Sequence, residues 1–372
     1  MRVLLLGNDE NILQSGSDSQ KRLIGYGVLA EQLHVLVFSA KQLPLRQIGN
    51  VLIYSSNGRG RFTALLKGYF LAKKIIRQNK IDVISTQDPF ESALVGWRLK
   101  RATRAKLNIQ IHGDFFSQNY WRRQRWFNFI RYQEAAFVFK KAESIRAVSG
   151  RIKQSLVDRF GISPEKIIVA PIYSDFSSWG VIGPGKRENN GGFVFLMVSR
   201  LTKEKNIPLV LRAFAELSKE GDSGSLLLHI VGEGPERKSL ETLAVKLGIN
   251  GKVEFLGWLD RQGLASRYQE ADCFLLSSDF EGWGLAVLEA AYFSLPIVMT
   301  DVGVCGDIFE RQKDVLCSAP RDLKGFLADM RKVLNDENLR QGLGQNAKAA
   351  LSRLPDKERT LNLYKKAWFV YS

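Results

Sequence analysis

The sequence predicts two doubly wound α/β domains that face each other across a cleft, with a C-terminal helix returning to the first domain. Short apolar runs alternate with amphipathic helical stretches along most of the 372 residues, which is typical of βαβ units on a parallel sheet. A segment rich in Gly, Pro and Asn, residues 179–192, interrupts this alternation and is typical of an interdomain linker. The length also suggests two domains rather than one.

We therefore expect a first domain over residues 1–178, a second domain over 193–355 and the returning helix over 356–372. The strands expected in the first domain are Val3–Leu6, His34–Phe38, Asp82–Thr86, Leu107–Ile111, Ser144–Val148 and Lys166–Ala170. Those expected in the second domain are Phe193–Ser199, Leu226–Val231, Val253–Leu256, Asp272–Leu276 and Pro296–Met299. Expected helices include Thr63–Gln78 and Trp121–Lys141. Ligands of open α/β sheets bind beyond the carboxyl ends of the strands, so the loops that follow these strands are candidates for function.

The net charge of +16 is concentrated in the first domain. Residues 1–178 contain 28 Lys and Arg against 13 Asp and Glu, whereas residues 179–372 contain 26 against 25. This asymmetry predicts an anionic partner for the first domain, which can be nucleic acid, an anionic membrane surface or a phosphate-bearing substrate. A basic surface that only keeps the protein soluble is the alternative.

The cysteines and the apolar runs indicate a cytoplasmic protein. Cys273, Cys305 and Cys317 form no close-spaced pair, which suits a reducing compartment and argues against a disulfide framework or a Cys-type zinc site. Met1–Leu6 is too short for the apolar core of a signal peptide. No apolar stretch approaches the roughly 20 residues that span a bilayer. We expect a cytoplasmic location, with peripheral attachment to the inner face of the membrane as an option.

Two carboxylates in the second domain flank a Gly-containing turn. Glu281 and Glu289 lie eight residues apart, around Trp283, Gly284 and Leu285. The turn follows an expected strand and opens an apolar helix, a geometry that directs backbone N–H groups and a positive helix end at an anion. The carboxylates can accept hydrogen bonds from sugar and ribose hydroxyls. Two solvated glutamates near an ordinary strand–helix junction are the alternative.

Two further loops of the second domain follow strands. Arg200 and Lys205 lie in one of them, where two cations can neutralise a diphosphate and the charge that develops on it as a leaving group. A solvated Lys-rich turn is the alternative. Gly232 and Gly234 form a strand-end turn that can let a nucleotide approach the backbone. The alternative is an ordinary turn, since Gly-Pro sequences are common in turns of any kind.

The first domain contributes a histidine and a small-residue loop. His112, one of three histidines, closes a strand and can donate to a sugar hydroxyl or a phosphate; a purely structural role is the alternative. Gly16, between two serines in the first post-strand loop, can let that loop close over a phosphate; an ordinary flexible loop is the alternative. Asp88 follows another strand, and we expect it to cap the next helix rather than to act in catalysis.

The run from Tyr120 to Tyr132 interleaves aromatic and basic residues on an expected helix. Such a helix can lie in a membrane interface, with its arginines on lipid phosphates. A helix with a buried aromatic face and a basic solvent face is the alternative, and single-stranded nucleic acid would use similar residues. Several motifs are absent from the sequence: Asp-x-Asp, Gly-x-Ser-x-Gly, a Walker-type loop and clustered His or Cys.

In their order and spacing these motifs resemble family 4 of the glycosyltransferases, retaining enzymes with two Rossmann-like domains in the GT-B fold. The matching segments are Ser199–Asn206, Gly232–Pro235, the pair Glu281 and Glu289, and Pro296–Gly303. The resemblance spans most of residues 80–310. Two segments depart from the family pattern: Ser15–Ser17 replaces a Gly-Gly pair, and Ala170–Tyr173 replaces a Pro-Asn pair.

The resemblance implies roles for individual residues. Arg200 and Lys205 would hold the donor diphosphate, Glu281 the donor-sugar hydroxyls and Glu289 the ribose. The amides of the turn from Trp283 to Leu285 would face sugar or phosphate. His112 would contact the donor sugar near the reacting carbon. Family members usually need no metal or other cofactor, and the leaving phosphate itself is thought to take the acceptor proton during front-face attack.

The expected function is therefore that of a retaining, metal-independent hexosyltransferase. It would move a sugar from a nucleoside-diphosphate sugar to a glycan or a polyprenyl- or other lipid-linked acceptor, in cell-surface polysaccharide or glycolipid synthesis. The alternatives are a nucleotide-sugar epimerase or hydrolase on the same fold, and a basic nucleic-acid-binding protein with a degenerate sugar site. Under the favoured hypothesis nucleic acid is not an expected partner.

Overall fold

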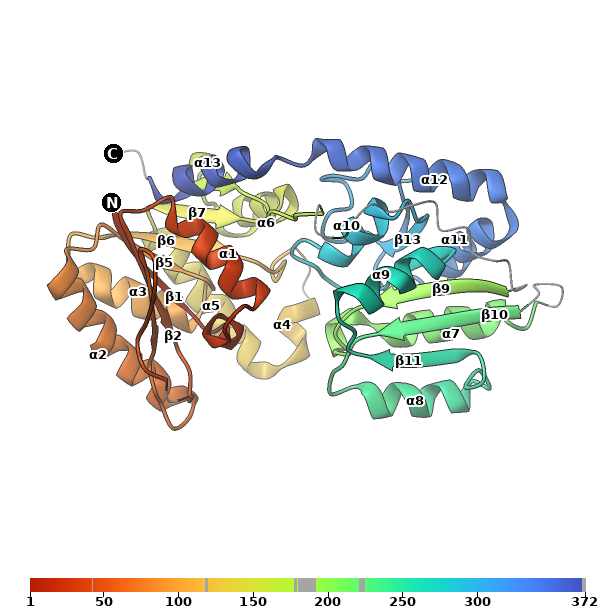
Figure 1. Ribbon diagram of the computed structural model, residues 1–372, viewed down its shortest axis with the longest axis horizontal. Helices are drawn as coiled ribbons and strands as arrows, with labels where there is room; N and C mark the ends of the chain where they lie inside the picture. Colours follow the sequence, from red (N-terminus) through yellow and green to blue (C-terminus); the bar gives the residue numbers. More distant parts are fainter. Residues whose placement is uncertain (42, 118–119, 177–178, 180–191, 221–224, 370–372) are drawn as a thin grey trace. The chain divides into compact units, whose positions relative to one another are not determined.

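A computed structural model describes residues 1–41, 43–117, 120–176, 179, 192–220 and 225–369, and it contains two compact units (Figure 1). The first unit comprises Met1–Ile172 and Asp356–Ser372, and the second comprises Tyr173–Pro355. Most of the expected linker, residues 180–191, lies outside the described residues, so the expected domain limits stay a prediction. Each unit is an α/β domain, which confirms the predicted fold class.

The first unit is built on an eight-stranded sheet with the order β3-β4-β2-β1-β5-β6-β7-β8. Its strands are β1 Arg2–Gly7, β2 Gln32–Val37, β3 Arg46–Ile48, β4 Val51–Ser55, β5 Val83–Thr86, β6 Lys106–Ile111, β7 Ser144–Ala147 and β8 Ile167–Val169. All neighbouring strands are parallel except β3 and β4. The chain leaves β1 toward β2 and later returns to its other side at β5. The strand order therefore reverses between β1 and β5, and this is where open α/β sheets bind ligands.

Helices cover both faces of this sheet. They are η1 Glu10–Leu13, α1 Asp18–Gly27, α2 Arg61–Asn79, α3 Glu91–Arg101, α4 Tyr120–Gln124, α5 Trp126–Lys141, α6 Gly150–Phe160, η2 Pro164–Lys166 and α13 Lys357–Trp368. Helix α3 packs against both α2 and α5, so these three helices share one face, as right-handed crossovers between parallel strands require. In Figure 1, α1 lies on the opposite side of β1 and β2 from α2 and α3.

The C-terminal helix α13 completes the core of the first unit. Tyr364 and Trp368 are almost fully buried among side chains of β1, β2 and α1. The ring of Tyr364 stacks on that of Tyr26 with centroids 4.2 Å apart. Asn108 of β6 donates to the carbonyl of Ala367 at 3.0 Å. The returning helix predicted from the sequence is thus confirmed.

The helix expected over Trp121–Lys141 is wrong in one respect, because it is broken at Arg125. This residue has an extended backbone (φ −146°, ψ 141°) between α4 and α5. In a continuous helix the Trp121 carbonyl would accept from the Arg125 N–H. Here it accepts from the side-chain amide of Asn128 at 2.7 Å. A local side-chain hydrogen bond therefore replaces a helical one, and the chain turns.

The second unit contains a fully parallel six-stranded sheet with the order β11-β10-β9-β12-β13-β14. Its strands are β9 Gly192–Val198, β10 Ser225–Val231, β11 Val253–Gly257, β12 Cys273–Leu276, β13 Ile297–Thr300 and β14 Leu316–Ser318. Its helices are η4 Lys203–Lys205, α7 Ile207–Leu217, α8 Arg237–Lys246, α9 Arg261–Glu270, α10 Leu285–Tyr292, α11 Leu323–Asn335, α12 Glu337–Ala350 and η5 Leu351–Arg353. The strand order reverses between β9 and β12.

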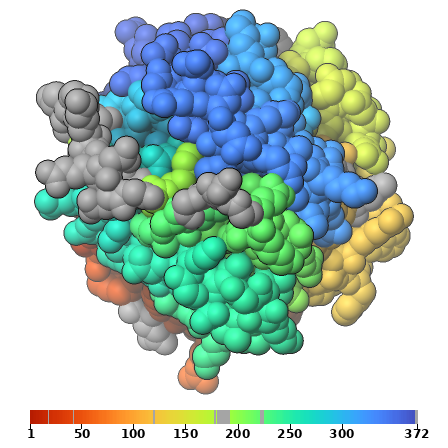
Figure 2. Space-filling view, turned by 90° about the vertical axis from the view of Figure 1, so that its right-hand side faces the viewer, coloured from red at the N-terminus to blue at the C-terminus, as the bar shows by residue number. Residues whose placement is uncertain are grey.

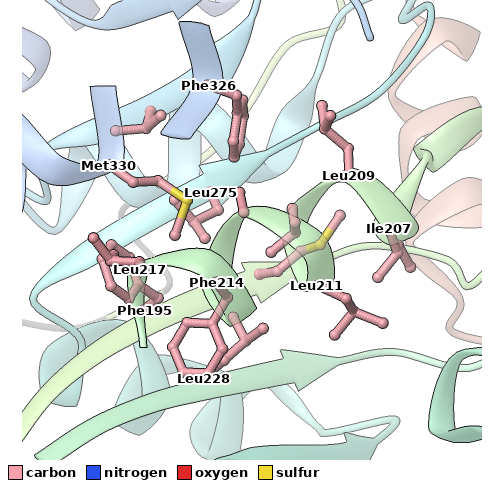
Figure 3. Close-up of a cluster of buried hydrophobic side chains, with 14 of the residues drawn as sticks. Phe195, Ile207, Leu209, Leu211, Phe214, Leu217, Leu228, Leu275, Phe326 and Met330 are labelled. Carbon is pink, nitrogen blue, oxygen red and sulfur yellow. The ribbon is translucent and has the colours of Figure 1, made fainter. Parts of the chain in front are cut away.

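Helix α7 lies at the centre of the core of the second unit. Its side chains Leu211, Phe214 and Leu217 pack with strand residues and with Phe326 and Met330 of α11 (Figure 3). The space-filling view shows the same neighbours from outside, with the blue α11–α12 segment against the green α7 segment (Figure 2). Each such buried side chain contributes roughly 1.5–3 kcal/mol relative to an exposed one.

Among the described segments, none of the helices has both the length and the hydrophobicity that a transmembrane span requires.

The substitution Trp368→Ala should lower the free energy of unfolding by about 3–5 kcal/mol, because it removes the largest side chain of α13 from the core of the first unit. Urea denaturation of the full chain measures this loss. Lys366→Ala, an exposed position on the same helix, is the control and should change stability by about 0.5 kcal/mol or less. Equal effects of the two substitutions would contradict the packing of α13.

Candidate functional site

The loops after β9 and β12 bring Lys205 and Glu281 together at the strand-order reversal of the second unit. The Lys205 ammonium forms an ion pair with Oε1 of Glu281, and the two side chains are only 13% and 12% exposed. Ser278 Oγ donates to the same oxygen at 2.8 Å. Two charges buried together compensate each other, whereas either one alone would be costly at this depth.

A second buried carboxylate, Asp279, fastens these loops. Its side chain, 3% exposed, accepts two hydrogen bonds from Arg321, at 3.0 and 2.9 Å, and one from Asn206 at 3.1 Å. Its backbone N–H donates to the carbonyl of Glu204 at 2.8 Å. These contacts hold both neighbours of Lys205, Glu204 and Asn206, against the segment that precedes Glu281. Ser278 and Asp279 were not among the predicted site residues, although both lie within three residues of the end of an expected strand.

Arg200 lies at the start of the same loop but has a different environment. Its side chain is 75% exposed, and its Nη2 lies 3.3 Å from Oε1 of Glu204. Glu204 also accepts from the Thr202 hydroxyl at 2.7 Å. The structure therefore groups Lys205 with Glu281, while Arg200 lies on the surface at the entrance of the loop.

The turn before α10 has the predicted form. Gly284 has a left-handed backbone (φ 95°) and precedes Leu285, the first residue of the helix. Trp283 is buried, and its carbonyl accepts from the N–H of Val304 at 2.9 Å. Gly303 lies so close to this turn that a Cβ there would be 2.6 Å from the Trp283 carbonyl oxygen. The segment after β13, which contains Gly303 and Val304, thus packs directly against the turn.

Glu289 faces α9. Its Oε2 accepts from the hydroxyl of Tyr268 at 2.9 Å. Burial, reinforced by the Glu289 charge, raises the pKa of Tyr268 well above its usual range, so this hydroxyl remains a donor. The contact gives Glu289 a structural role, and its expected contact with a ribose stays a prediction.

Gly232 and Gly234 are required by packing within the protein. A Cβ at Gly232 would lie 1.9 Å from the carbonyl oxygen of Ser199, and one at Gly234 would lie 2.3 Å from that of Leu201. The two loops that follow β9 and β10 therefore touch backbone to backbone. Their additional role at a nucleotide stays a prediction.

The first unit contains a cavity of about 440 Å³ at its own strand-order reversal. Its polar lining comes from β6, from the loops after β1, β5 and β6 and from α1, and includes Asn8, Arg22, Gln87, Asp88, Gln110 and His112. Its aromatic lining comprises Tyr26, Phe90, Phe115 and Tyr364. The cavity thus combines aromatic faces with a small set of polar groups, as is usual for small-molecule sites.

Two titratable side chains in this cavity have shifted pKa values. Burial, with added repulsion from Arg146 and Arg22, lowers the pKa of His112 to about 3, so its imidazole is neutral near pH 7. Burial raises the pKa of Asp88. Asp88 accepts from Asn8 at 3.0 Å, from the Phe90 N–H at 2.9 Å and from the Ser92 hydroxyl. These last two contacts lie at the start of α3, where a capping role was expected.

Gly16 lies in the turn between η1 and α1, with a left-handed backbone (φ 77°). Its N–H donates to the side chain of Gln20 at 3.0 Å, and Ser17 caps α1 through the Gln20 N–H. Of the eleven predicted site residues, Gly16 and His112 belong to the first unit and the other nine to the second. Their roles toward a ligand stay predictions.

Two family models match this sequence. One, described as Glycosyl transferases group 1, matches residues 184–350. The other, described as Glycosyltransferase Family 4, matches residues 29–172. The first therefore covers most of the second unit, and the other covers most of the first.

Individual relatives agree with the family models. A glycogen synthase of Mycobacterium tuberculosis is 30% identical over 220 residues, which are 59% of this chain and 51% of that protein, so the match spans about half of the relative's length. The GalNAc-alpha-(1->4)-GalNAc-alpha-(1->3)-diNAcBac-PP-undecaprenol alpha-1,4-N-acetyl-D-galactosaminyltransferase of Campylobacter jejuni is 26% identical over 77% of this chain and 75% of its own. The solved sucrose-phosphate synthase of Thermosynechococcus elongatus superposes with a TM-score of 0.82 at 17% identity, covering both chains completely.

The shifted pKa of His112 predicts a pH-dependent stability. Because its folded pKa of about 3 lies below the ordinary 6.5, the unfolded chain takes up the proton first, and stability is lost as the pH falls from about 6.5 toward 3. Between pH 7 and pH 5 the wild-type chain should lose about 1–2 kcal/mol more than His112→Gln. Urea denaturation at the two pH values measures the difference, and equal losses would show that His112 is not held neutral by the fold.

Proposed function

This chain belongs to the group 1 glycosyltransferases of family 4, and from that membership we propose that it is a retaining enzyme that uses a nucleoside-diphosphate sugar as donor. The observation that most supports a nucleoside-diphosphate sugar as the donor is the buried pair of Lys205 and Glu281 at the strand-order reversal of the second unit. A cation and a carboxylate held there match the two chemical parts of such a donor, the diphosphate and the sugar hydroxyls.

Lys205 and Glu281 would bind different parts of the donor, the diphosphate and the sugar. An ammonium group has three donors, so Lys205 can keep its bond to Glu281 while it also binds the diphosphate. Both Lys205 and Ser278 contact Oε1 of Glu281, and in our proposal Oε2 accepts from the sugar. Asp279 and Arg321 hold the two loops in place before the donor arrives, so little reorganisation is needed when charge develops.

The proposed reaction needs no protein nucleophile. The acceptor hydroxyl would attack from the face that the phosphate leaves, and the leaving phosphate would take its proton. Lys205, together with Arg200 at the loop entrance, would stabilise the negative charge on that phosphate. We propose that the enzyme works without a metal or another cofactor. His112, which is neutral near pH 7, can donate a hydrogen bond without adding charge.

We propose that the acceptor is a glycan or a lipid-linked glycan, bound in part by the cavity of the first unit. The aromatic rings there suit sugar faces, and the amides of Gln87, Gln110 and Asn8 suit hydroxyl groups. The relative from Campylobacter jejuni, which matches 77% of this chain, carries a polyprenyl diphosphate in its name. This motivates the lipid-linked alternative.

Exposed apolar residues on two helices of the first unit support attachment to an anionic bilayer. Phe62, Leu66 and Phe70 form a row along one side of α2, with Phe62 77% exposed. We call this the α2 row. Trp126, Phe129, Ile130 and Phe137 are exposed on α5, with Trp126 80% exposed, and we call these the α5 row. The aromatic and basic residues from Tyr120 to Tyr132 predicted the region of the α5 row, whereas the α2 row was not predicted.

Exposed basic residues accompany the α2 row. Helix α2 has no Asp or Glu, and its exposed residues include Arg61, Lys67, Lys74 and Arg77. Ion pairs of Glu91 connect the two helices, since Glu91 binds Arg61 of α2 and Arg131 of α5. Apolar side chains beside cations are the usual means by which a surface helix enters an anionic lipid interface.

A thermal-shift screen with UDP, GDP, ADP and their sugars tests the donor. One of these ligands at 100 times its Kd should add about 2.7 kcal/mol of stability. Lys205→Met should reduce this gain strongly, while Lys203→Met, an exposed change in the same loop, should retain it. If no nucleotide stabilises the protein, the donor assignment is wrong. Incubating the donor alone separates a transferase from an epimerase, which would convert it without an acceptor.

Glu281→Ala and Lys205→Ala should each lower turnover by about 10²-fold or more, because both groups act on developing charge. The double variant is informative, since each single change leaves a buried charge without its partner. Initial rates and denaturation curves of the three variants separate lost catalysis from lost stability. Near-wild-type rates in both single variants would remove Lys205 and Glu281 from the proposed site.

Flotation with vesicles tests the membrane surface. The protein should float with vesicles that contain anionic lipid and much less with neutral ones, and high salt should weaken the binding. Phe62→Ser combined with Phe70→Ser, and separately Trp126→Ser, should each weaken it by about tenfold or more. Trp258→Ser, an exposed tryptophan of the second unit, is the matched control. Equal flotation of all variants would argue against both rows.

A further inference from the structure

Two cysteines that are twelve residues apart in the sequence lie in contact in the second unit. The Sγ atoms of Cys305 and Cys317 are 2.9 Å apart, and both residues are buried. Cys305 follows β13, and Cys317 lies in β14, where it pairs with Met299 of β13. The spacing of the cysteines in the sequence did not reveal this contact, because it arises only when adjacent parallel strands bring the two segments together.

A bound metal is one interpretation of this place. The two Sγ atoms and a carboxylate oxygen of Asp301 all lie within 4.8 Å of one another. Two observations disfavour it. Thiolates on a tetrahedral zinc, with bonds of about 2.3 Å, would be about 3.8 Å apart, which exceeds the observed separation. The Asp301 carboxylate is also held by Arg311 through two hydrogen bonds of 3.0 and 2.9 Å, so a cation already occupies it.

We propose that Cys305 and Cys317 form a reversible disulfide when a hydroperoxide oxidises them, and that this bond acts on the turn at Glu281–Gly284. A disulfide bond is about 2.05 Å long, so the sulfur atoms need to approach by about 0.9 Å only. Such a pair suits a reducing compartment, where disulfides are mostly transient and serve redox sensing.

The burial of the two thiols indicates the order of the reaction. Cys317 is 8% exposed and Cys305 is fully buried, so an oxidant reaches Cys317 first. The hydrogen bond with Cys317, together with burial, raises the pKa of Cys305 well above its usual range, which makes Cys305 a poor initial nucleophile.

The chemistry balances with one molecule of hydrogen peroxide. The Cys317 sulfur attacks one peroxide oxygen, the O–O bond breaks, and a sulfenic acid and one water result. The Cys305 sulfur then attacks the Cys317 sulfur, the S–O bond breaks, and the departing hydroxide leaves as water with the Cys305 proton. Two thiols thus lose two electrons, and the peroxide is reduced to two waters.

The segment that contains Cys305 supports the turn before α10. The N–H of Val304 donates to the Trp283 carbonyl at 2.9 Å. A Cβ at Gly303 would lie 2.9 Å from Cβ of Glu281, so this backbone touches both residues. Drawing Cys305 toward β14 therefore displaces the support of the turn. This consequence rests on the proposed function, because it takes the turn to be part of the donor site.

Peptide mapping of the wild-type chain tests the disulfide directly. Cleavage before aspartate places the three cysteines on separate peptides, since Asp279 and Asp301 lie between Cys273 and Cys305, and Asp314 precedes Cys317. After hydrogen peroxide treatment and alkylation in denaturant, the peptides of Cys305 and Cys317 should be linked and lighter by two hydrogen atoms. Dithiothreitol should restore both thiols. Cys273, which is buried elsewhere in the core, is the internal control and should remain alkylatable.

Three outcomes of the mapping would overturn the disulfide. These are the absence of the linked peptide, linkage through Cys273 instead, and stoichiometric zinc that survives dialysis and protects both thiols from alkylation. Bound zinc of this kind would show that Cys305 and Cys317 form a metal site instead. Cys305→Ala is the matched variant, and it should yield oxidised Cys317 without any linked peptide.

The effect on the donor site is measured by nucleotide affinity. Oxidation should weaken the binding of the stabilising nucleoside diphosphate, among UDP, GDP and ADP, by about fivefold or more. The affinity of the Cys305→Ala, Cys317→Ala double variant should not change on oxidation. Equal affinity of oxidised and reduced wild-type protein would overturn the coupling. Absence of binding in both forms would instead overturn the donor assignment, and the mass measurement would still decide the disulfide.

Discussion

The reversal of strand order in each sheet is the constraint on which the candidate sites depend. Parallel strands need right-handed crossovers, so a chain that extends a sheet in one direction must return past its first strand to extend it in the other. In the second unit this separates the loops after β9 and β12, which position Lys205 and Glu281. In the first unit it separates the loops after β1 and β5, which provide Asn8 and Asp88 to the cavity. Backbone topology thus selects where polar side chains can gather.

Charge compensation then determines the state of those side chains. In the second unit Lys205 forms an ion pair with Glu281, and Asp279 forms one with Arg321. The first unit uses a different arrangement around the buried Arg146. Its guanidinium binds the Gln110 side chain at 3.1 Å and the Pro171 carbonyl at 3.3 Å, and it lies 3.8 Å from the ring centroid of Tyr364. This buried cation helps to keep His112 neutral, so the same residue connects the packing of α13 to the chemistry of the cavity.

Local patterns in the sequence were sufficient to predict most strands, the returning helix, and Lys205 and Glu281 as members of strand-end loops. The strands Arg46–Ile48, Val51–Ser55 and Leu316–Ser318 were missed, and the first and last of these have only three residues. The break at Arg125 depends on a side-chain hydrogen bond of Asn128, which helix periodicity does not reveal. Arg321 was missed because it reaches Asp279 across 42 residues of sequence. The contact of Cys305 with Cys317 likewise needs the sheet to exist first.

The position of α13 affects the order in which the protein can assemble during translation. The core of the first unit includes Tyr364 and Trp368, which a ribosome adds only after the whole second unit has been made. The second unit contains all of its own strands and helices in one continuous segment and can fold as it emerges. Until α13 has been synthesised, part of the apolar face of β1 and β2 in the N-terminal segment remains uncovered. A nascent chain of this protein is therefore a candidate substrate for chaperones that shield apolar surfaces.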